Sequence, residues 1–331
     1  MVSEQEPAYK VIFVRHGQST WNKANRFIGW TDPNLTKTGE LEARVAGQVL
    51  LAAGYEFDII YTSLLKRSIK TAWVVMDELG LHHVPVVTDW RLNERCYGAL
   101  VGRNKKECVR VYGEDQVKLW RRSFDVRPPP ISEDSSLWPG NNRKYDFLER
   151  ALIPRTESLQ DTQARSVDCW DNTIVPTIRS GKRVCVCGHE NNLRSLLKHL
   201  DGVSDDDIRH VELPRAVPLI YHLDENFKPI RLEGAAPHLN GRYIGDAEEI
   251  AAIMARDLAN VYDLSVESNL EESDVPHYAA KLDDLLQPCE LTDDAFGERG
   301  GLDELNCRES DIEETPLFIY KSHEDAARAR V

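Results

Sequence analysis

Two short, mostly apolar segments that each end directly at a histidine constrain this sequence more than any other feature. Tyr9–Val14 is rich in β-branched and aromatic residues and is followed by Arg15-His16-Gly17. Arg183–Gly188 is a second such segment, and the next residue is His189. Short apolar runs bounded by glycine or polar residues are typical of buried strands. The sequence therefore predicts that both histidines follow the carboxyl ends of buried strands.

Two further segments, 57–61 and 84–88, also read as strands, and helical patterns lie between the predicted strands. The first helix is expected to begin in the polar segment around Thr38, with apolar residues recurring at helical spacing at Leu41, Val45, Val49 and Ala52. The second is expected after Ser63 and carries Arg67, Ala72 and Val75. Strands that alternate with helices predict an α/β, three-layer sandwich with a mostly parallel central sheet flanked by helices. Ligands of such sheets collect at the carboxyl ends of the strands, where both histidines are expected.

The charge of the chain is unevenly distributed. The whole sequence of 331 residues carries a formal net charge of −14. Residues 263–331 hold 19 acidic and 6 basic side chains, so residues 1–262 are nearly neutral. We therefore predict a catalytic domain over 1–262 and an acidic, partly disordered C-terminal extension over 263–331. Nothing in this distribution resembles the basic patch of a nucleic-acid-binding protein.

Other features of the composition point to a cytoplasmic protein. No run of apolar residues reaches the roughly 18 that a membrane helix needs, and the first residues are polar and acidic. The seven cysteines are scattered and odd in number, which favours reduced thiols over a disulfide framework. Cys185 and Cys187 share one face of a predicted strand, which indicates core packing rather than a metal site.

The predicted strand ends carry the chemistry of phosphoryl transfer. An imidazole is a good nucleophile at neutral pH, the fork of Arg15 matches phosphate oxygens, and Gly17 permits close backbone approach to a ligand. Phosphoryl transfer also needs positive charge around the equatorial oxygens. Further cations are available at Arg67, Arg95, Lys105, Arg121 and Arg122. Glu94 is a lone carboxylate among them and suits a general acid and base.

Taken together, these motifs resemble a known family. Val14–Asn22, with the sequence VRHGQSTWN, resembles the nucleophile motif of the histidine phosphatase superfamily. Several other segments resemble its 2,3-bisphosphoglycerate-dependent phosphoglycerate mutase branch: Phe27–Trp30, Tyr61–Ser63, Arg67–Ala72, Arg91–Gly98, Arg121–Pro130, Thr156–Leu159, Arg215–Leu219 and Gly241–Asp246. The resemblance covers about residues 11–262 and includes a lid-like insertion at 121–156 that plain phosphatases of the superfamily generally lack.

The resemblance implies a phosphoglycerate mutase-like fold and the interconversion of 3- and 2-phosphoglycerate in glycolysis and gluconeogenesis. His16 would accept the phosphoryl group, Arg15, Arg67 and His189 would bind it, and Glu94 would move the proton. The residues that would hold the phosphoglycerate are Asn22, Gly29, Arg95, Tyr97, Lys105, Arg121, Arg122 and Asn191. The implied cofactor is 2,3-bisphosphoglycerate, which primes the histidine, and no metal is implied. The implied partner is the small phosphorylated substrate, with no nucleic acid or membrane, and related proteins form dimers or tetramers.

Two residues depart from the pattern of the family. Ile28 stands where the family has a small hydroxyl residue, so a side-chain hydrogen bond to the substrate is lost. Glu190 stands where the family has glycine in His-Gly-Asn. A carboxylate that faced the ligand would repel phosphate and raise the pKa of His189, whereas one that turned onto a nearby arginine would change little.

Three hypotheses follow. The first is an active mutase. The second is a histidine phosphatase or a bisphosphoglycerate mutase or phosphatase paralogue in which water competes as the acceptor, and Ile28 and Glu190 motivate it. The third is a non-catalytic relative that binds ligands, which the intact set of catalytic residues argues against.

Overall fold

The structure is a computed structural model that describes residues 7–262. The acidic extension predicted at 263–331 lies outside the described residues, so the predicted domain boundary stays a prediction. Among the described residues, no helix combines the length and the apolar character that crossing a bilayer requires.

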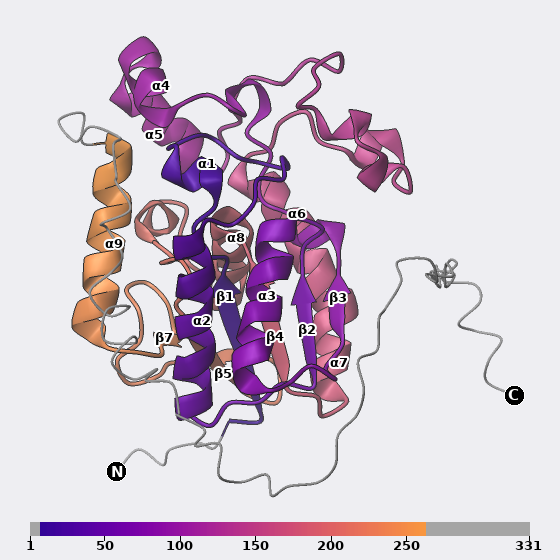
Figure 1. The fold of residues 1–331 in the computed structure, drawn as a ribbon, viewed down its shortest axis with the longest axis vertical. Coiled ribbons are helices and arrows are strands. Elements are labelled where there is room, and N and C mark those ends of the chain that lie inside the picture. Colours follow the sequence, from indigo (N-terminus) through magenta and orange to yellow (C-terminus); the bar gives the residue numbers. More distant parts are fainter. Residues whose placement is uncertain (1–6, 263–331) are drawn as a thin grey trace, which may run out of the picture. The chain divides into compact units, whose positions relative to one another are not determined.

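Within residues 7–262 the strands form a seven-stranded sheet in the order β3-β2-β4-β1-β5-β6, and β7 pairs with β5 (Figure 1). The strands that the sequence predicts are parallel to one another: β1 (Tyr9–Arg15), β2 (Ile59–Thr62), β3 (Val86–Thr88) and β4 (Val184–Gly188). The others were not predicted and pair antiparallel: β5 (Leu219–Leu223), β6 (Pro229–Ile230) and β7 (Arg242–Tyr243). The sheet is therefore parallel at its centre, as predicted, and becomes antiparallel beyond β1.

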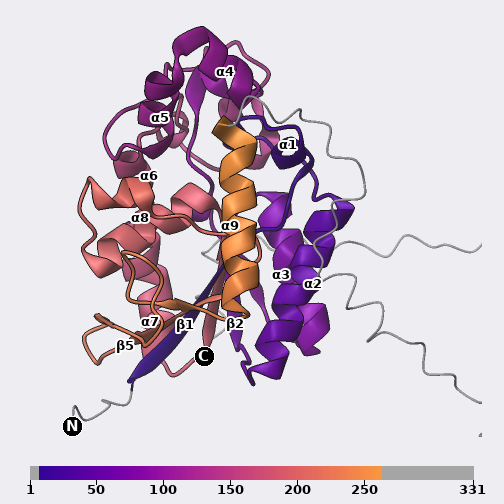
Figure 2. The same ribbon diagram turned by 90° about the vertical axis from the view of Figure 1, so that its left-hand side faces the viewer.

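Helices cover both faces of this sheet and confirm the three-layer α/β sandwich (Figure 2). One face carries α2 (Lys37–Ala52) and α3 (Lys66–Leu79). The other carries α6 (Leu159–Cys169), the π-helical turn η6 (Trp170–Ile174), α7 (Val175–Arg179) and α8 (Glu190–Asp201). The sheet positions between these layers are buried on both sides, which explains the continuous apolar runs of β1 and β4.

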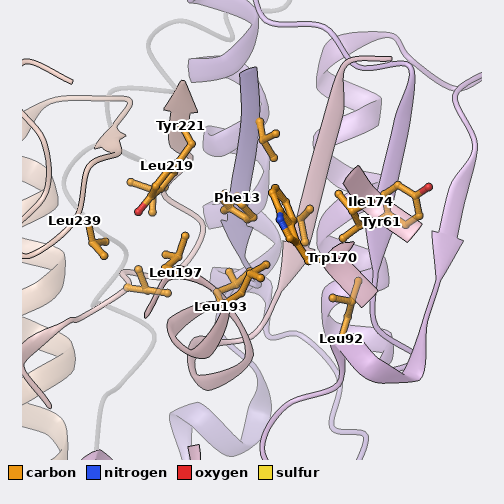
Figure 3. Packing of buried hydrophobic residues seen from close by; sticks show 14 of the residues in the cluster. Phe13, Tyr61, Leu92, Trp170, Ile174, Leu193, Leu197, Leu219, Tyr221 and Leu239 are labelled. Atoms are coloured by element: carbon orange, nitrogen blue, oxygen red, sulfur yellow. The ribbon is translucent and has the colours of Figure 1, made fainter. Parts of the chain in front are cut away.

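Alternate residues of β1 enter two different cores because side chains of a strand point to opposite faces. Phe13 packs against Trp170 and Tyr221 on the α6–α8 side, with ring centroids 6.0 and 5.5 Å away (Figure 3). Ile12 and Val14 pack on the α2–α3 side. Cys185 and Cys187 of β4 lie in that second core as free, buried thiols, which confirms their predicted packing role.

The remaining helices lie mainly beyond the carboxyl ends of the central strands. They are α1 (Thr20–Lys23), α4 (Lys105–Tyr112), α5 (Glu114–Arg122) and α9 (Ala247–Tyr262), with short turns η1 (Trp90–Leu92), η2 (Gly98–Leu100) and η7 (Asp207–His210). Helix α9 runs beside α2, where Arg256 contacts Glu42 at 3.4 Å. The same Glu42 carboxylate accepts a hydrogen bond of 2.7 Å from the backbone N–H of Gln18. The last described helix is thus linked to the loop that follows His16.

Helix α2 buries a different face from the one that the sequence predicts. It begins after Thr36, whose hydroxyl accepts a hydrogen bond from the Gly39 N–H at 3.0 Å, within the polar segment in which the sequence predicts its start. Its buried residues include Ala43, Ala46, Gly47 and Leu50, whereas Leu41 and Ala52 are exposed and Val45 and Val49 are only half-buried. The reason is close packing, because a Cβ on Gly47 would lie 2.6 Å from Cβ of Glu78 in α3. Small residues add little to a hydrophobic pattern, so a buried face made of them is hard to predict from the sequence.

Helix α3 agrees with the prediction, and Arg67, Ala72 and Val75 are all buried. The predicted irregular segment, 121–156, begins in α5 and then contains only the short turns η3 (Pro139–Asn141), η4 (Arg143–Tyr145) and η5 (Arg150–Leu152). Its Trp138 and Tyr145 belong to a small core that also includes Trp30 from outside the segment. That core gives the segment a defined position although it lacks long helices and strands.

Candidate active site

The two predicted histidines lie side by side because β1 and β4 are neighbours in the sheet. Arg15 pairs with Gly188 at the ends of these strands, and the N–H of His16 donates to the Gly188 carbonyl at 3.0 Å. The rings of His16 and His189 meet edge to face, with centroids 5.0 Å apart. This position at the carboxyl ends of parallel strands is the one that the sequence predicts.

The contacts of His16 define its tautomer. Its Nδ1 lies 2.7 Å from the carbonyl oxygen of Gly17, which can only accept, so Nδ1 carries the proton. Nε2 is therefore the atom with the lone pair, and it accepts a hydrogen bond of 3.2 Å from Nε of Arg67. Burial, followed by the charges of Arg67 and Arg15, holds the pKa of His16 well below its usual value. The ring is thus a neutral imidazole with a lone pair on Nε2.

Gly17 has a structural role in addition to the predicted one. A Cβ at this position would lie 2.1 Å from the carbonyl oxygen of Gly39 in α2. The glycine is therefore required for contact between two backbone segments of the protein, and its role in the approach of a ligand stays a prediction. The loop is further held by a hydrogen bond of 3.1 Å from the Gly17 N–H to the hydroxyl of Thr71.

Arg67 is fixed by backbone carbonyls. It is buried, and its Nη1 and Nη2 donate to the carbonyls of Thr31 and Gly29 at 2.9 and 3.0 Å. Burial lowers its pKa to about 10, so the guanidinium stays charged at neutral pH. Gly29 can offer its carbonyl in this direction because its φ is 57°, which favours glycine.

His189 is held by one serine that directly follows β2 and by another in α3. Its Nε2 lies 2.7 Å from the hydroxyl of Ser63 and 3.3 Å from that of Ser68. Its Nδ1 is buried and has no hydrogen-bond partner among the described residues. Donation by the Ser63 hydroxyl to Nε2 would leave the proton on Nδ1 and make it a donor for a ligand oxygen. Burial, followed by the charges of Arg67 and His16, lowers the pKa of His189 well below its usual value.

Glu94 contacts the N-terminus of α8 from a separate loop. Its Oε1 accepts hydrogen bonds from the N–H groups of Arg95 and Asn191, at 2.8 and 3.1 Å, and the side chain is buried. Burial lowers the pKa of Arg67, and the charge of Glu94 partly offsets this effect. The two side chains therefore interact electrostatically. The amide of a helix N-terminus suits a carboxylate.

Glu190, the first residue of α8, joins two arginines that the sequence assigns to the ligand. Its Oε2 lies 2.9 Å from Nη2 of Arg15, and its Oε1 lies 2.7 Å from Nη1 of Arg122. Arg15 also donates to the carbonyl of Leu213 at 2.6 Å, and Arg122 pairs with Glu212 at 2.8 Å. Although burial alone would raise it, the charges of Arg15 and Arg122 hold the pKa of Glu190 well below its usual value.

This geometry answers the question that the sequence left open. The carboxylate turns onto arginines, but those arginines are themselves among the predicted site residues. The pKa of His189 is lowered rather than raised, because burial and neighbouring cations act on it.

Other predicted ligand residues form a second cluster of cations. Nη2 of Arg95 donates to the carbonyl of Arg121 at 3.0 Å, and its guanidinium lies 4.5 Å from the ring centroid of Tyr97. Nε and Nη1 of Arg95 are buried and have no hydrogen-bond partner among the described residues. Burial, followed by the charge of Arg121, lowers the pKa of Lys105 to about 7. Nδ2 of Asn191 donates to the Tyr97 hydroxyl at 3.0 Å.

The predicted residues near α1 are less clearly part of the site. The side-chain oxygen of Asn22 accepts hydrogen bonds from the N–H and hydroxyl of Ser19, which closes the capping box of α1. Gly29 contacts the site through Arg67, as described. Ile28 is buried, and its carbonyl accepts a hydrogen bond from the Thr31 hydroxyl at 2.7 Å. The substitution of a hydroxyl residue by Ile28 thus leaves no side-chain donor at that position.

Sequence analysis missed two buried arginines that support the site. Arg165 donates to the carbonyls of Asn93 and Glu94 at 2.7 and 3.0 Å, and pairs with Glu157 at 2.8 Å. It therefore holds the loop that carries Glu94, and no local pattern indicates this role. Arg194 donates to Oδ1 of Asn191 at 3.0 Å. The spacing of three residues on α8 could have placed Arg194 beside Asn191.

Comparison with known proteins agrees with this geometry. Residues 11–232 match the model of the histidine phosphatase superfamily (branch 1). YhfR of Bacillus stearothermophilus is a similar solved structure, with a TM-score of 0.52 and 22% identity over 70% of this chain and 99% of its own. A mycobacterial glucosyl-3-phosphoglycerate phosphatase has a TM-score of 0.52 and 20% identity over 67% of this chain and 96% of its own.

A third similar structure, a putative α-ribazole-5′-phosphate phosphatase of Escherichia coli, has a TM-score of 0.50 and 20% identity over 72% of this chain and 99% of its own. At these identities the likeness establishes the fold. The comparisons do not single out the phosphoglycerate mutases that the sequence motifs resemble. With a family match over more than half of its length, the chain belongs to branch 1 of the histidine phosphatase superfamily.

Proposed function

We propose that this chain transfers a phosphoryl group from a small phosphate monoester to Nε2 of His16 and then to an acceptor. The observation that carries the proposal is the defined tautomer of His16, with Nδ1 bonded to the Gly17 carbonyl and the lone pair on Nε2. A neutral, oriented imidazole of this kind is a nucleophile at neutral pH without further activation.

The surrounding residues supply the other parts of the transfer. As the bond between Nε2 and phosphorus forms, the bond from phosphorus to the ester oxygen breaks, and Glu94, when protonated, gives its proton to that oxygen. Arg67, already held by carbonyls, and Nδ1 of His189, which has no partner in the part of the chain that the structure describes, stabilise charge on the phosphoryl oxygens. The Gly17 carbonyl stabilises the positive charge that develops on the ring. In the second step Glu94 takes the proton of the acceptor hydroxyl.

The second cluster of cations supports a substrate with a further anionic group. One phosphoryl group needs only the charges around His16, yet Arg95, beside Arg121, has two buried N–H groups that no described residue accepts. Phosphoglycerate has a carboxylate that suits such donors. We therefore propose as the first candidate the interconversion of 3- and 2-phosphoglycerate, with 2,3-bisphosphoglycerate as the primer of His16 and without a metal in any step.

A phosphatase is the second candidate. In a mutase, phosphorylated His16 gives its phosphoryl group to 3-phosphoglycerate, and the bound bisphosphate must stay in place until it returns a phosphoryl group to His16. Here Glu190 occupies Arg15 and Arg122, and Ile28 offers no side-chain donor, so an intermediate is held by fewer contacts and water can replace it. Phosphatases are also among the structurally similar members of the superfamily.

One assay separates these candidates. The protein is incubated with 3-phosphoglycerate, with and without 2,3-bisphosphoglycerate, while 2-phosphoglycerate and inorganic phosphate are measured in the same sample. A mutase forms 2-phosphoglycerate much faster than phosphate and depends on the bisphosphate. A phosphatase releases phosphate at a rate equal to or above that of isomer formation. Absence of both products, and of a phosphohistidine after incubation with the bisphosphate, contradicts the proposal.

A further inference from the structure

We propose that Glu190 is a specificity-determining residue that takes the place of one anionic group of a ligand and so limits the negative charge that the site accepts. This inference rests on the proposed function, because it concerns the ligand of the same site. It deepens that function by naming what Glu190 limits: the affinity that the site gains from each further anionic group of a phosphate monoester, most of all for bisphosphates.

The first step of the argument is the geometry of the carboxylate. Glu190 places one oxygen on each of two arginines, at 2.9 Å from Arg15 and 2.7 Å from Arg122. Only 15% of its side chain is exposed, and the arginine side chains are 10% and 11% exposed. A carboxylate that joins two guanidinium groups in this way uses the donors that a phosphate or carboxylate of a ligand would use.

The second step is the position of Glu190 in the chain. It is the first residue of α8, directly after His189 and directly before Asn191, whose N–H binds Glu94. Its backbone is therefore held between two residues of the site, and the carboxylate has a defined place relative to His16. Oppositely charged neighbours hold its pKa well below the usual value, so the carboxylate carries its full charge at neutral pH.

The third step is the contrast among the cations. Arg95 has two buried N–H groups without a hydrogen-bond partner among the described residues and Arg15 has one, its Nε, whereas Nη2 of Arg15 and Nη1 of Arg122 are joined to Glu190. A ligand with one phosphoryl group and one carboxylate can use the groups around His16 and those of Arg95. A further phosphoryl group that approaches Arg15 and Arg122 meets the charge of Glu190. The repulsion grows with the charge of the ligand.

Glu212 provides a matched control. It pairs with the other Nη of Arg122 at 2.8 Å and is more exposed, at 25% of its side chain. A Glu212→Gln variant therefore removes a carboxylate from the same arginine but leaves Arg15 and the bridge intact. Any general effect of lowering the negative charge near Arg122 is present in this control.

The experiment measures binding by calorimetry at low salt in a His16→Ala background, in which no ligand is consumed. Glu190→Gln and Glu212→Gln are each compared with the His16→Ala parent. The probes are glycerol 2-phosphate, 3-phosphoglycerate and 2,3-bisphosphoglycerate. We expect Glu190→Gln to tighten binding of glycerol 2-phosphate by less than about twofold, of 3-phosphoglycerate by about threefold and of the bisphosphate by about tenfold or more. Glu212→Gln should change all three dissociation constants by less than about threefold.

Equal tightening for all three probes, or weaker binding of the bisphosphate, would overturn the inference. If Glu190→Gln does not fold, Glu190→Gly repeats the comparison. Should neither fold, the parent protein alone provides the test, because with Glu190 in place the bisphosphate should bind less than about tenfold more tightly than glycerol 2-phosphate. A larger difference would contradict the proposed role.

These results are independent of the reaction that the protein catalyses. Binding is measured in a protein that cannot form the phosphohistidine, so absence of mutase activity would leave a charge-dependent effect of Glu190 standing. Conversely, an active mutase with equal tightening for all probes would remove only the role of Glu190.

Discussion

The inner group of the site, which comprises His16, Arg67 and His189, is held by backbone carbonyls and serine hydroxyls. The outer group, which comprises Arg15, Arg122 and Glu190, is held mainly by ion pairs among its own members. Backbone contacts keep their geometry when a ligand arrives, whereas an ion pair can be exchanged for a ligand anion. The comparison suggests a division of tasks in which the inner group performs the chemistry and the outer group sets which anions bind. The predictions below test that division.

The largest effect is expected at the inner group. His16→Ala should abolish phosphoryl transfer, because no other described group offers an oriented lone pair beside Arg67. Incubation with 2,3-bisphosphoglycerate should leave an acid-labile, base-stable phosphate on the wild-type chain. The variant should keep the melting temperature of a folded protein and carry no such label. An unchanged label on the variant would assign the nucleophile elsewhere.

The next effect concerns Glu94. Glu94→Gln should lower turnover by about two to four orders of magnitude, the usual range for a general acid or base. The amide oxygen can still accept from the N–H groups of Arg95 and Asn191, so the fold should be retained. Labelling of His16 by the bisphosphate is expected to suffer less than turnover. Turnover near that of the wild type would show that a different group moves the proton.

A third prediction compares a buried and an exposed ion pair. Arg165 and Glu157, whose side chains are 8% and 6% exposed, support the loop of Glu94. Arg165→Ala should lower the free energy of unfolding by about 3–5 kcal/mol, because it leaves a carboxylate buried without its partner. Arg127→Ala, which breaks the more exposed pair with Asp161, should cost less than about 1 kcal/mol. Urea denaturation measures both values, and similar losses would contradict a supporting role for Arg165.

Arg165 also illustrates what sequence reasoning could not supply. The strand ends with His16 and His189 could be predicted, because short apolar runs are local and both are followed at once by the functional residue. Arg165 acts through bonds to residues more than 70 positions away in sequence, and nothing near it in the chain signals such contacts. The direction of Glu190 was likewise undetermined, because Arg15 and Arg122 come from distant elements.

Helix α2 shows a second kind of limit. The helix itself was predicted, but its buried face was not, since Ala43, Ala46 and Gly47 contribute little apolar area. Close packing on α3 selects small residues there, and such packing depends on the partner helix. The family resemblance gave the candidate site residues, whereas the contacts among them required the structure.

A fourth prediction uses the pH dependence of stability. The folded protein holds the pKa of His16 well below the roughly 6.5 of an unfolded chain, so the unfolded state binds more protons between these values. The contribution of the neutral ring to the free energy of unfolding is therefore fully present above about pH 6.5 and is lost as the pH falls. When the pH is lowered from 7 to 5, the free energy of unfolding of His16→Gln should fall by about 1–2 kcal/mol less than that of the wild type. His82→Gln, at a side chain that is 71% exposed, serves as the control and should follow the wild type.

The smallest effect is expected from the acidic extension, which lies outside the described residues. Its excess of acidic side chains, 19 against 6 basic ones, can act on anionic substrates through long-range repulsion. Such repulsion concerns ligand approach, so truncation after Tyr262 should lower KM by about threefold or less at low salt and leave kcat unchanged. Because the Debye length is about 10 Å at 0.1 M salt and about 3 Å at 1 M, the difference should vanish at high salt. A change in kcat would show that the extension acts on the inner group, and an identical KM at low salt would leave it without a role at the site.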